Sequence, residues 1–580
     1  MYAGAFQIGE STDMRRASPF LPLLVAALPL PAAAQTAPPA NAMPGMDMAA
    51  PATFPQSLAD WAKGAQLFDG LGDFHRDAGT KSPEAQLYFD QGMRFIWAFN
   101  HDEATRAFAK SATLDPGCAM CFWGVALTLG PNYNMPMMAP ARARVGWDAV
   151  TEAQRLADHA TAPDRAMIGA LAKRFAGAAP LDPANSPPLL AAYAAAMRDA
   201  ARAFPADLDL QTLFAESLMN LNPWKLWAAD GAPAPGTQEI VATLEAVLAK
   251  DPQHPGANHY YIHAIEASAH PELAVPAAER VAHMMPAAGH LDHMPAHILQ
   301  RVGRYEESAA ANRAGAAADL TYFARTAPPD YYPMYTLHNY TFLASSAAME
   351  GRKAEAIDAM RKTRAMASDA QMLGMPGSEW YTAFLYEAMV RFGMWDEILA
   401  EPAPNPKLTG MAVCYSAARA TALAARNRLD EARAEIARLD ALIAAAPADA
   451  AAAMNAGRPL YEIAALRAKA RIALMGHDRP AAIALFTHAV ALEDALSYDE
   501  PADEFFPGRH LLGAALLDAA RPVEAEAVYR EDLRRNPENG WALLGLAKAL
   551  EAQQHDAADV RARFARAWAH ADTKIEHSAF

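Results

Sequence analysis

Helix-favouring stretches recur along almost the whole chain and set the expectation for its architecture. Segments rich in Ala, Leu, Arg and Glu continue to the last residues, whereas β-branched residues are sparse. Ala, Leu, Arg and Glu form helices readily, and strands need the β-branched residues that are scarce here. With 580 residues the chain can bury a large core. The sequence therefore predicts an all-α protein.

Small, aromatic and proline positions recur within these stretches with a period of 34 residues. Near the end of the chain they are occupied by Gly513, Ala525, Tyr529 and Pro537. Near the start the same offsets are occupied by Gly92, Ala104, Phe108 and Pro116. Small residues let paired helices approach closely, and the proline ends the second helix. The pattern resembles the tetratricopeptide (TPR) repeat, and it extends over most of residues 82–572. It implies a TPR-type α-solenoid or superhelix of roughly eight to ten helical pairs.

The first residues predict export. Arg15 and Arg16 precede an apolar stretch over residues 20–30, and small residues at 32–34 form a cleavage site. We interpret residues 1–34 as a signal peptide, with Met14 as an alternative true start. The apolar stretch is too short to span a bilayer, so we expect a soluble periplasmic protein without stable membrane insertion.

Composition divides the rest of the chain into a linker and three helical regions. Residues 35–56 are rich in Ala, Pro and Met and predict a disordered linker, although Met43, Met46 and Met48 could also bind copper(I). We expect an N-terminal TPR-like region at 57–250, a central histidine-rich region at 251–365 and a C-terminal region at 366–580. Residues 221–236 look like an insertion, and insertions in solenoids often cover a binding groove.

Charge and cysteine content narrow the function classes. The net charge is −16 with no block of Lys or Arg, which argues against a nucleic-acid partner. Cys118 and Cys121 predict a local disulfide in an oxidising compartment, or plain packing, with a redox or metal role as the less favoured alternative.

Histidines gather in the middle of the chain at spacings typical of one helix face. His259 and His263 are four residues apart. Steps of three and then four residues separate His290, His293 and His297. At these spacings the imidazoles of one helix can converge on one point.

Aligning the repeats predicts which way these histidine side chains point. In TPR proteins the first helix of each pair lines the concave groove through its second, fifth and ninth positions. In three consecutive repeats these positions fall on His259, His263, His290, His293, His297 and His338. The histidines outside these positions are His254, His270 and His283. We therefore expect six histidines to face one groove.

Such a convergence predicts a transition-metal site, with zinc or copper as the ion, because neutral imidazole is a good ligand for both. Met294 could supply a soft ligand for copper, and Asp292 could orient the ligands. Glu266 lies one turn beyond His263 and could be a ligand, an orienting group or, in an enzyme only, a general base.

The alternative is a structural role for these histidines. Some could hydrogen-bond to Tyr260, Tyr261 or backbone carbonyls. Pro295 also removes a helical hydrogen bond and predicts a kink between His293 and His297.

Several longer motifs resemble a family of exported bacterial TPR proteins of poorly defined function. They occupy residues 99–130, 258–268 (NHYYIHAIEAS), 289–305 (GHLDHMPAHILQRVGRY), 498–501 (YDEP) and 539–546 (NGWALLGL). The resemblance implies the fold and export but no established reaction. The family often has His-Asn-x-His-Phe where this chain has Thr341 after His338 and Asn339, so one potential ligand is missing.

A second polar cluster is less specific. Its acidic residues, which precede His510, are Asp499, Glu500, Asp503 and Glu504. Acid-rich segments are usually solvated faces or helix starts, and we interpret this one in that way.

Three functions remain open. The first is a periplasmic solenoid that binds a transition metal in its groove. The second is a scaffold for a protein or peptide partner, the commonest role of this architecture. The third, and the least supported, is a metal-dependent hydrolase with Glu266 as base. No Ser-His-Asp motif, phosphate loop or metallohydrolase signature occurs, so a non-enzyme is favoured.

Overall fold

The computed structural model describes residues 54–136, 138, 140–179, 186–328 and 331–580. The predicted signal peptide, the alternative start at Met14 and the three linker methionines lie outside these residues. In the part of the chain that is described, no helix is both long enough and apolar enough to cross a membrane.

Helices dominate the first half of the described chain. In chain order they are α1 (Leu58–Lys63), α2 (Pro83–Trp97), α3 (His101–Leu114), α4 (Ala119–Leu129), α5 (Pro140–Leu156), η1 (Ala157–His159), α6 (Ala162–Ala172), α7 (Ser186–Ala203), α8 (Leu208–Met219), α9 (Thr237–Lys250), α10 (Pro255–Ile265), η3 (Pro271–Ala274), α11 (Val275–Val281), α12 (Gly289–His293) and α13 (Pro295–Arg301).

The second half continues the same organisation. Its elements are α14 (Tyr305–Arg325), α15 (Pro333–Met349), α16 (Lys353–Met366), α17 (Asp369–Gly374), α18 (Glu379–Arg391), α19 (Trp395–Ala400), α20 (Thr409–Ala425), α21 (Leu429–Ala445), β1 (Ala451–Ala452), β2 (Asn455–Ala456), α22 (Gly457–Met475), α23 (Arg479–Glu493), α24 (Gly508–Asp518), α25 (Pro522–Arg535), α26 (Gly540–Ala552) and α27 (Ala558–Ala567). The two short strands pair antiparallel, with Ala451 opposite Ala456.

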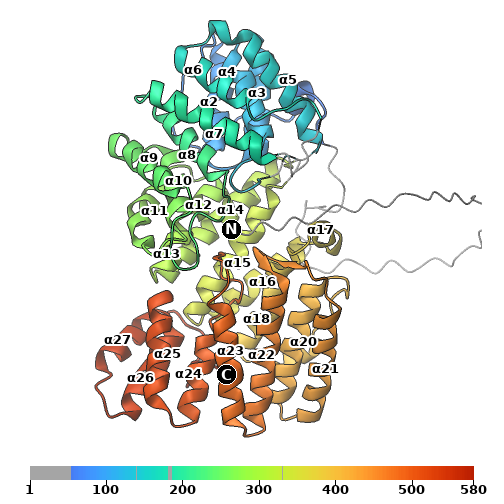
Figure 1. The fold of residues 1–580 in the computed structure, drawn as a ribbon, viewed down its shortest axis with the longest axis vertical. Coiled ribbons are helices and arrows are strands. Elements are labelled where there is room, and N and C mark those ends of the chain that lie inside the picture. Colours follow the sequence, from blue (N-terminus) through green and yellow to red (C-terminus); the bar gives the residue numbers. More distant parts are fainter. Residues whose placement is uncertain (1–53, 137, 139, 180–185, 329–330) are drawn as a thin grey trace, which may run out of the picture. The chain divides into compact units, whose positions relative to one another are not determined.

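Consecutive helices pack in pairs, and each pair packs on the next, as the colour gradient in Figure 1 shows. The pairs are α2/α3, α4/α5, α6/α7, α8/α9, α10/α11, α12–α13/α14, α15/α16, α18/α19, α20/α21, α22/α23, α24/α25 and α26/α27. The all-α TPR-type solenoid is confirmed. There are more pairs than the eight to ten that we predicted, because the stretch from α4 to α9 carries little of the repeat pattern.

Glycine and aromatic residues explain how neighbouring pairs approach. The Phe108 ring of α3 lies between Gly92 of α2 and Gly124 of α4, and a Cβ at either glycine would fall 2.6 Å or less from that ring. Tyr529 of α25 lies in the same way between Gly513 and Gly545, with corresponding distances of 2.3 and 2.2 Å. Only a residue without a side chain fits at these crossings.

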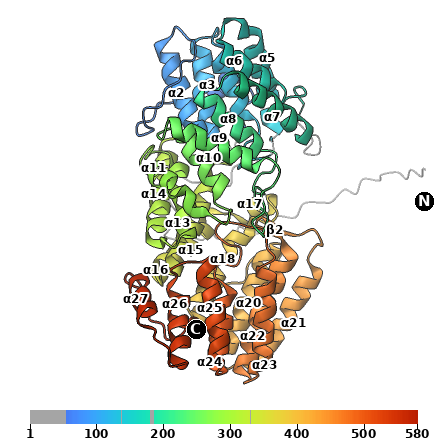
Figure 2. The same ribbon diagram turned by 60° about the vertical axis from the view of Figure 1, so that its left-hand side comes forward.

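The C-terminal helices contact the middle of the chain. The indole N–H of Trp541, on α26, donates to the carbonyl of Ala348, on α15, at 2.8 Å. The ring of Trp568 packs on Gly351, in the turn between α15 and α16. The backbone N–H groups of Lys353 and Ala354, at the start of α16, donate to Asp572, shortly after α27, at 2.6 and 2.8 Å (Figure 2). Segments about 200 residues apart in the sequence therefore lie together next to the histidine-rich repeats.

Candidate metal centre

The six histidines predicted to converge do lie together. We call them the histidine cluster: His259 and His263 on α10, His290 and His293 on α12, His297 on α13 and His338 on α15. The ring centroids of His259 and His290 are 5.0 Å apart, and those of His263 and His297 are 5.6 Å apart. His338 lies 4.8 Å from His293 on the same measure. Three consecutive repeats thus contribute to one group.

The helix that carries three of these residues is interrupted at the predicted place. Helix α12 ends at His293 and α13 begins at Pro295, so Met294 separates two short helices. Proline has no N–H to continue the ladder. Met294 keeps helical dihedral angles, φ −52° and ψ −33°, so the break is small. His293 and His297 therefore still face each other, with their Nε2 atoms 2.7 Å apart.

The first triad, His259, His263 and His290, is oriented by neighbouring acceptors. The Nδ1 of His259 donates to the carbonyl of Trp97 at 2.6 Å, and the Nδ1 of His263 donates to Glu266 at 3.1 Å. The Nε2 atoms of both rings are buried and have no hydrogen-bond partner among the described residues. Both ring nitrogens of His290 are likewise buried and have no hydrogen-bond partner among the described residues. Each of the three residues offers one ring nitrogen as a possible ligand, and these three nitrogens lie within 4.8 Å of one another.

The second triad, His293, His297 and His338, has a similar arrangement. The Nδ1 of His293 donates to the side-chain oxygen of Asn312, on α14, at 2.7 Å. That bond leaves the Nε2 of His293 directed at His297. The ligand nitrogens of the three residues again lie within 4.8 Å of one another.

Two carboxylates complete the centre. Glu266, directly after α10, has one oxygen 3.1 Å from His263 Nδ1 and the other 3.0 Å from His297 Nδ1. Glu500, in the segment between α23 and α24, also contacts His297 Nδ1. Glu266, His297 and Glu500 form a third group of potential ligands. His297 therefore belongs to both the second triad and the carboxylate group.

Burial and charge divide the imidazoles into two kinds. Burial, together with neighbouring imidazoles, holds the pKa values of His259, His263, His290 and His293 well below the usual range. For His338, burial and the charge of His297 lower the pKa to about 3. These five rings are neutral near pH 7 and each retains a lone pair.

The imidazole of His297 behaves in the opposite way. Burial would lower its pKa, but the carboxylates of Glu500 and Glu266 raise it to about 10. Burial in turn raises the pKa of Glu500 to about 7, against the attraction of His297. The cluster thus contains one imidazolium held between two carboxylates.

Aromatic rings cover the histidine cluster. The rings of Phe99 and Tyr335 lie 4.5 Å from His259 and 4.2 Å from His290, respectively. Trp224 and Tyr133 stack on each other at 5.1 Å and pack on His263 at 5.5 and 5.3 Å. Trp224 belongs to the predicted insertion at 221–236, whose Trp227 donates to the carbonyl of Ala264 at 2.7 Å.

This cover corrects the picture of an open groove. Five of the six histidines are at most 1% exposed, and His338 is partly exposed. Alignment of the repeats identifies the inner face of the solenoid, but it does not show that the insertion and the loop around Tyr133 fill the space in front of that face.

The auxiliary residues are also buried. Met294 packs in the main hydrophobic core. Burial and neighbouring Asp319 raise the pKa of Asp292 to about 7. Thr341, where the family often has histidine, uses its hydroxyl to donate to the carbonyl of His338 at 2.8 Å.

The three histidines outside the inner positions lie apart from the ligand groups of the described chain. The ring of His254 accepts from the Ala257 N–H at 3.1 Å, which caps α10, and its Nε2 is 3.0 Å from Asp209. His270 and His283 are exposed. A structural role accounts for His254.

The expectation of a solvated acidic segment was wrong. Glu500 is 6% exposed and Asp503 only 2%. Asp503 accepts from Asn455 at 2.7 Å, and Asp499 accepts from the Tyr381 hydroxyl at 2.8 Å. These donors and the contact with His297 offset part of the cost of burying the carboxyl groups, although Glu500 and one oxygen of Asp503 have no hydrogen-bond partner among the described residues.

His510 is buried at the start of α24 and has a structural environment. Its Nε2 donates to Asp532 at 2.8 Å, and its Nδ1 accepts from Arg391 at 2.8 Å. Both ring nitrogens are therefore occupied.

Cys118 and Cys121, at the start of α4, form a disulfide. The third cysteine, Cys414, is buried and free.

Sequence reasoning missed two members of the centre. Glu500 belongs to a segment that also matched a family motif (YDEP), but its acidic neighbours suggested a solvated surface. Asn312 carries no signal, because a single asparagine in the middle of a helix is unremarkable until its partner His293 is known.

Comparison with known proteins gives limited information. No family model matches the chain, and no curated protein does. Among solved structures, the chain is similar to one described as the APC/C hetero-tetramer Cut9–Hcn1, with 15% identity, a TM-score of 0.30 and coverage of 88% of this chain and 81% of that one. It is also similar to the human IFIT1 dimer with m7Gppp-AAAA, with 11% identity, a TM-score of 0.29 and coverage of 88% and 99%. The helical-repeat fold of this chain therefore rests on its own helices.

Proposed function

We propose that the histidine cluster binds transition-metal ions and that this binding is the central function of the solenoid. The observation that supports it most strongly is the common orientation of three imidazoles. His259, His263 and His293 each direct Nδ1 at an oxygen acceptor and keep the lone pair on Nε2. Metal-bound histidines in proteins are held in this way, because the second hydrogen bond fixes both the tautomer and the ring direction.

The unpartnered nitrogens support the same proposal. A buried polar atom without a partner destabilises the fold by about 1–3 kcal/mol. The first triad contains four such nitrogens: Nε2 of His259, Nε2 of His263 and both ring nitrogens of His290. A cation that takes one lone pair from each of the three rings would compensate most of this cost and leave only one N–H of His290 without a partner.

The donor set favours zinc or copper(II). Imidazole nitrogens with nearby carboxylate oxygens suit these ions, and three histidines with a fourth position is a common zinc arrangement. The first triad provides one binding place. The second triad provides an adjacent one once a metal ion displaces the proton on Nε2 of His297, with Glu266 and Glu500 supplying negative charge. In this proposal Met294 and Asp292 remain auxiliary, because Met294 packs in the core and Asp292 lies beside Asp319.

The proposal includes location. We infer export from the predicted signal peptide and from the resemblance to exported TPR proteins. The disulfide between Cys118 and Cys121 supports an oxidising compartment. A periplasmic protein with this centre would store, sense or deliver the metal.

A protein- or peptide-binding scaffold is the second candidate, because TPR-type solenoids commonly bind such partners. A hydrolase is less well supported. Each oxygen of Glu266 faces an imidazole, at 3.1 Å from His263 and 3.0 Å from His297, and is therefore engaged in orienting ligands.

Metal analysis of protein purified without an affinity tag tests the proposal. We expect bound zinc or copper in the intact chain and its loss from the first triad in a His259→Gln/His263→Gln variant. His270→Gln is the matched control, because His270 is exposed and outside the cluster, and it should retain the metal.

The outcome that contradicts the proposal is metal-free protein whose melting temperature does not change when zinc or copper is added. If metal is present, turnover of ester, peptide and phosphate substrates distinguishes storage from hydrolysis. Capture of a peptide by metal-free protein would favour the scaffold.

A further inference from the structure

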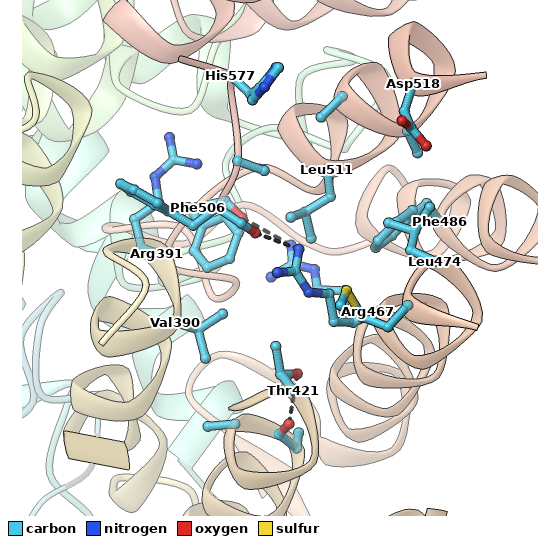
Figure 3. Close-up of a pocket in the computed structure, with 18 of the residues that line it drawn as sticks. Val390, Arg391, Thr421, Arg467, Leu474, Phe486, Phe506, Leu511, Asp518 and His577 are labelled. Carbon is cyan, nitrogen blue, oxygen red and sulfur yellow. Dashed lines mark hydrogen bonds between the residues drawn. The ribbon is translucent and has the colours of Figure 1, made fainter. Parts of the chain in front are cut away.

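We propose that a second cavity, in the C-terminal half, binds an organic carboxylate with an apolar body. The cavity has a volume of about 550 Å³ and is lined by α18, α20, α22 and α24, with contributions from α23, α26 and the residues after α27. Figure 3 shows its side chains. Its size is within the range of small-molecule sites, about 300–1,000 Å³. It shares no residue with the histidine cluster.

The charge of the lining is opposite to that of the protein. The chain carries a net charge of −16. The cavity is nevertheless lined by five cationic side chains, Arg391, Arg467, Arg471, Arg479 and Lys548. The acidic side chains that line it are Glu387 and Asp518. The excess of positive charge selects an anionic ligand.

Internal ion pairs neutralise only part of this charge. Arg479 pairs with Asp518 at 2.6 Å, and Arg467 pairs with Glu493 at 2.6 Å. Arg391 and Arg471 form no ion pair with an Asp or Glu side chain of the described residues. Their terminal nitrogens donate to main-chain oxygens near the end of the chain, Arg391 to Ser578 at 3.4 Å and Arg471 to Phe580 at 2.5 Å. The Nε–H groups of both guanidinium groups remain for a ligand.

Arg391 gives the clearest sign that an anion belongs here. It is 3% exposed, its guanidinium lies 3.6 Å from the Trp541 ring, and one terminal nitrogen donates to His510. Burial holds its pKa well below the usual value of arginine, even with Asp532 nearby. Its Nε, like the Nε atoms of Arg467 and Arg471, has no partner among the described residues. Buried N–H groups of this kind require acceptors, and a carboxylate offers two oxygens in a geometry that guanidinium groups match.

The remaining wall defines the body of the ligand. It is formed by the apolar side chains of Val390, Leu474, Phe486, Phe506 and Leu511, which lie around Arg467 in Figure 3. Phe506 lies 5.0 Å from the guanidinium carbons of both Arg391 and Arg467. An acid with an alkyl chain or a ring would place its carboxylate at the arginines and its body against this wall.

Isothermal titration of the mature full-length chain with decanoate tests the inference. We expect saturable binding of one equivalent, and binding of decan-1-ol at least tenfold weaker, because the alcohol has the same chain without the charge. Arg471→Gln should weaken decanoate binding at least tenfold. Arg433→Gln is the charge-matched control, since Arg433 is exposed on α21, outside the cavity, and it should bind as the wild type does.

A steric variant keeps the test independent of the arginines. Ala514, on α24, is a partly exposed residue of the lining, so Ala514→Trp fills the cavity without altering a charge. We expect it to abolish binding while the helical circular dichroism spectrum is unchanged. Decanoate binding that is absent, without fixed stoichiometry, equal to that of decan-1-ol, or unaffected by both variants would overturn the inference. The titration is repeated with a chelator. Decanoate binding that is the same with and without the chelator shows that this cavity acts independently of any metal at the histidine cluster.

Discussion

At the scale of single residues, burial decides the ionisation of most polar groups in the core. Glu216, on α8, is 4% exposed and accepts from the side-chain amide of Asn220 at 2.7 Å. Burial raises its pKa to about 7, although Asn220 and Arg174 act in the opposite direction. The titratable groups that interact with it electrostatically are Arg174, Tyr193 and Tyr260.

A carboxyl group whose pKa is raised by folding stabilises the folded state most at low pH. For Glu216 this contribution is complete below the ordinary value of 4.5 and is lost as the pH rises through about 7. We expect the wild type to lose about 2–3 kcal/mol more than Glu216→Gln does between pH 5 and pH 9. Urea unfolding at both pH values measures the difference. Equal losses in the two proteins would show that Glu216 is not protonated in the core.

At the scale of elements, packing of aromatic rings on glycines sets the spacing of helix pairs. Phe108 is enclosed on both sides, by Gly92 and Gly124, so the ring cannot move away from an added methyl group. Overpacking of this kind commonly costs about 1–3 kcal/mol.

Gly92→Ala should therefore lower the thermal stability of the protein, by an amount in that range. Gly169→Ala is the matched control, because Gly169 lies on α6 with no atom within 4 Å of an added Cβ. The control should be neutral or stabilising by up to about 1 kcal/mol, since alanine favours the helix. A loss of stability in the control equal to that of Gly92→Ala would attribute the effect to the backbone and not to Phe108.

Elements also show what the sequence could predict. The glycine, alanine, aromatic and proline positions identify helix pairs because each position has a steric reason that does not depend on distant residues. The inner face of α10, α12 and α15 follows from helical spacing, and so do the six histidines on it. The cover formed by Trp224 and Tyr133 does not follow, because loop packing depends on contacts that have no periodicity.

At the scale of the whole molecule, the centre depends on residues that the chain brings together from far apart. Glu500 reaches His297 because the segment between α23 and α24 packs against the central repeats. The Trp541 and Trp568 contacts hold α26 and the end of α27 beside α15 and α16. No local pattern predicts such a contact, so the acidic segment looked solvated in the sequence.

We expect Glu500→Gln to weaken metal binding at the second triad by about 10–100-fold, the usual effect of losing a group that orients a ligand. The first triad should keep its affinity, because Glu500 contacts only His297 in the cluster. Titration of metal-free protein with zinc measures both sites. Glu504→Gln, four residues further on, is the control and should bind both ions normally. Equal weakening of both triads would point to a general disturbance of the fold.

The aromatic cover affects how fast a bound metal ion exchanges as well as how tightly it binds. An ion held by the first triad behind Trp224 and Tyr133 would be shielded from solvent, since His259, His263 and His290 are at most 1% exposed. Exchange with a chelator or a receiving protein would require the insertion to detach from α10, so its rate would be the opening rate of that segment. Residence time and binding strength would then be set by different residues, and a partner that pulls on residues 221–236 could release the metal without competing for a single ligand.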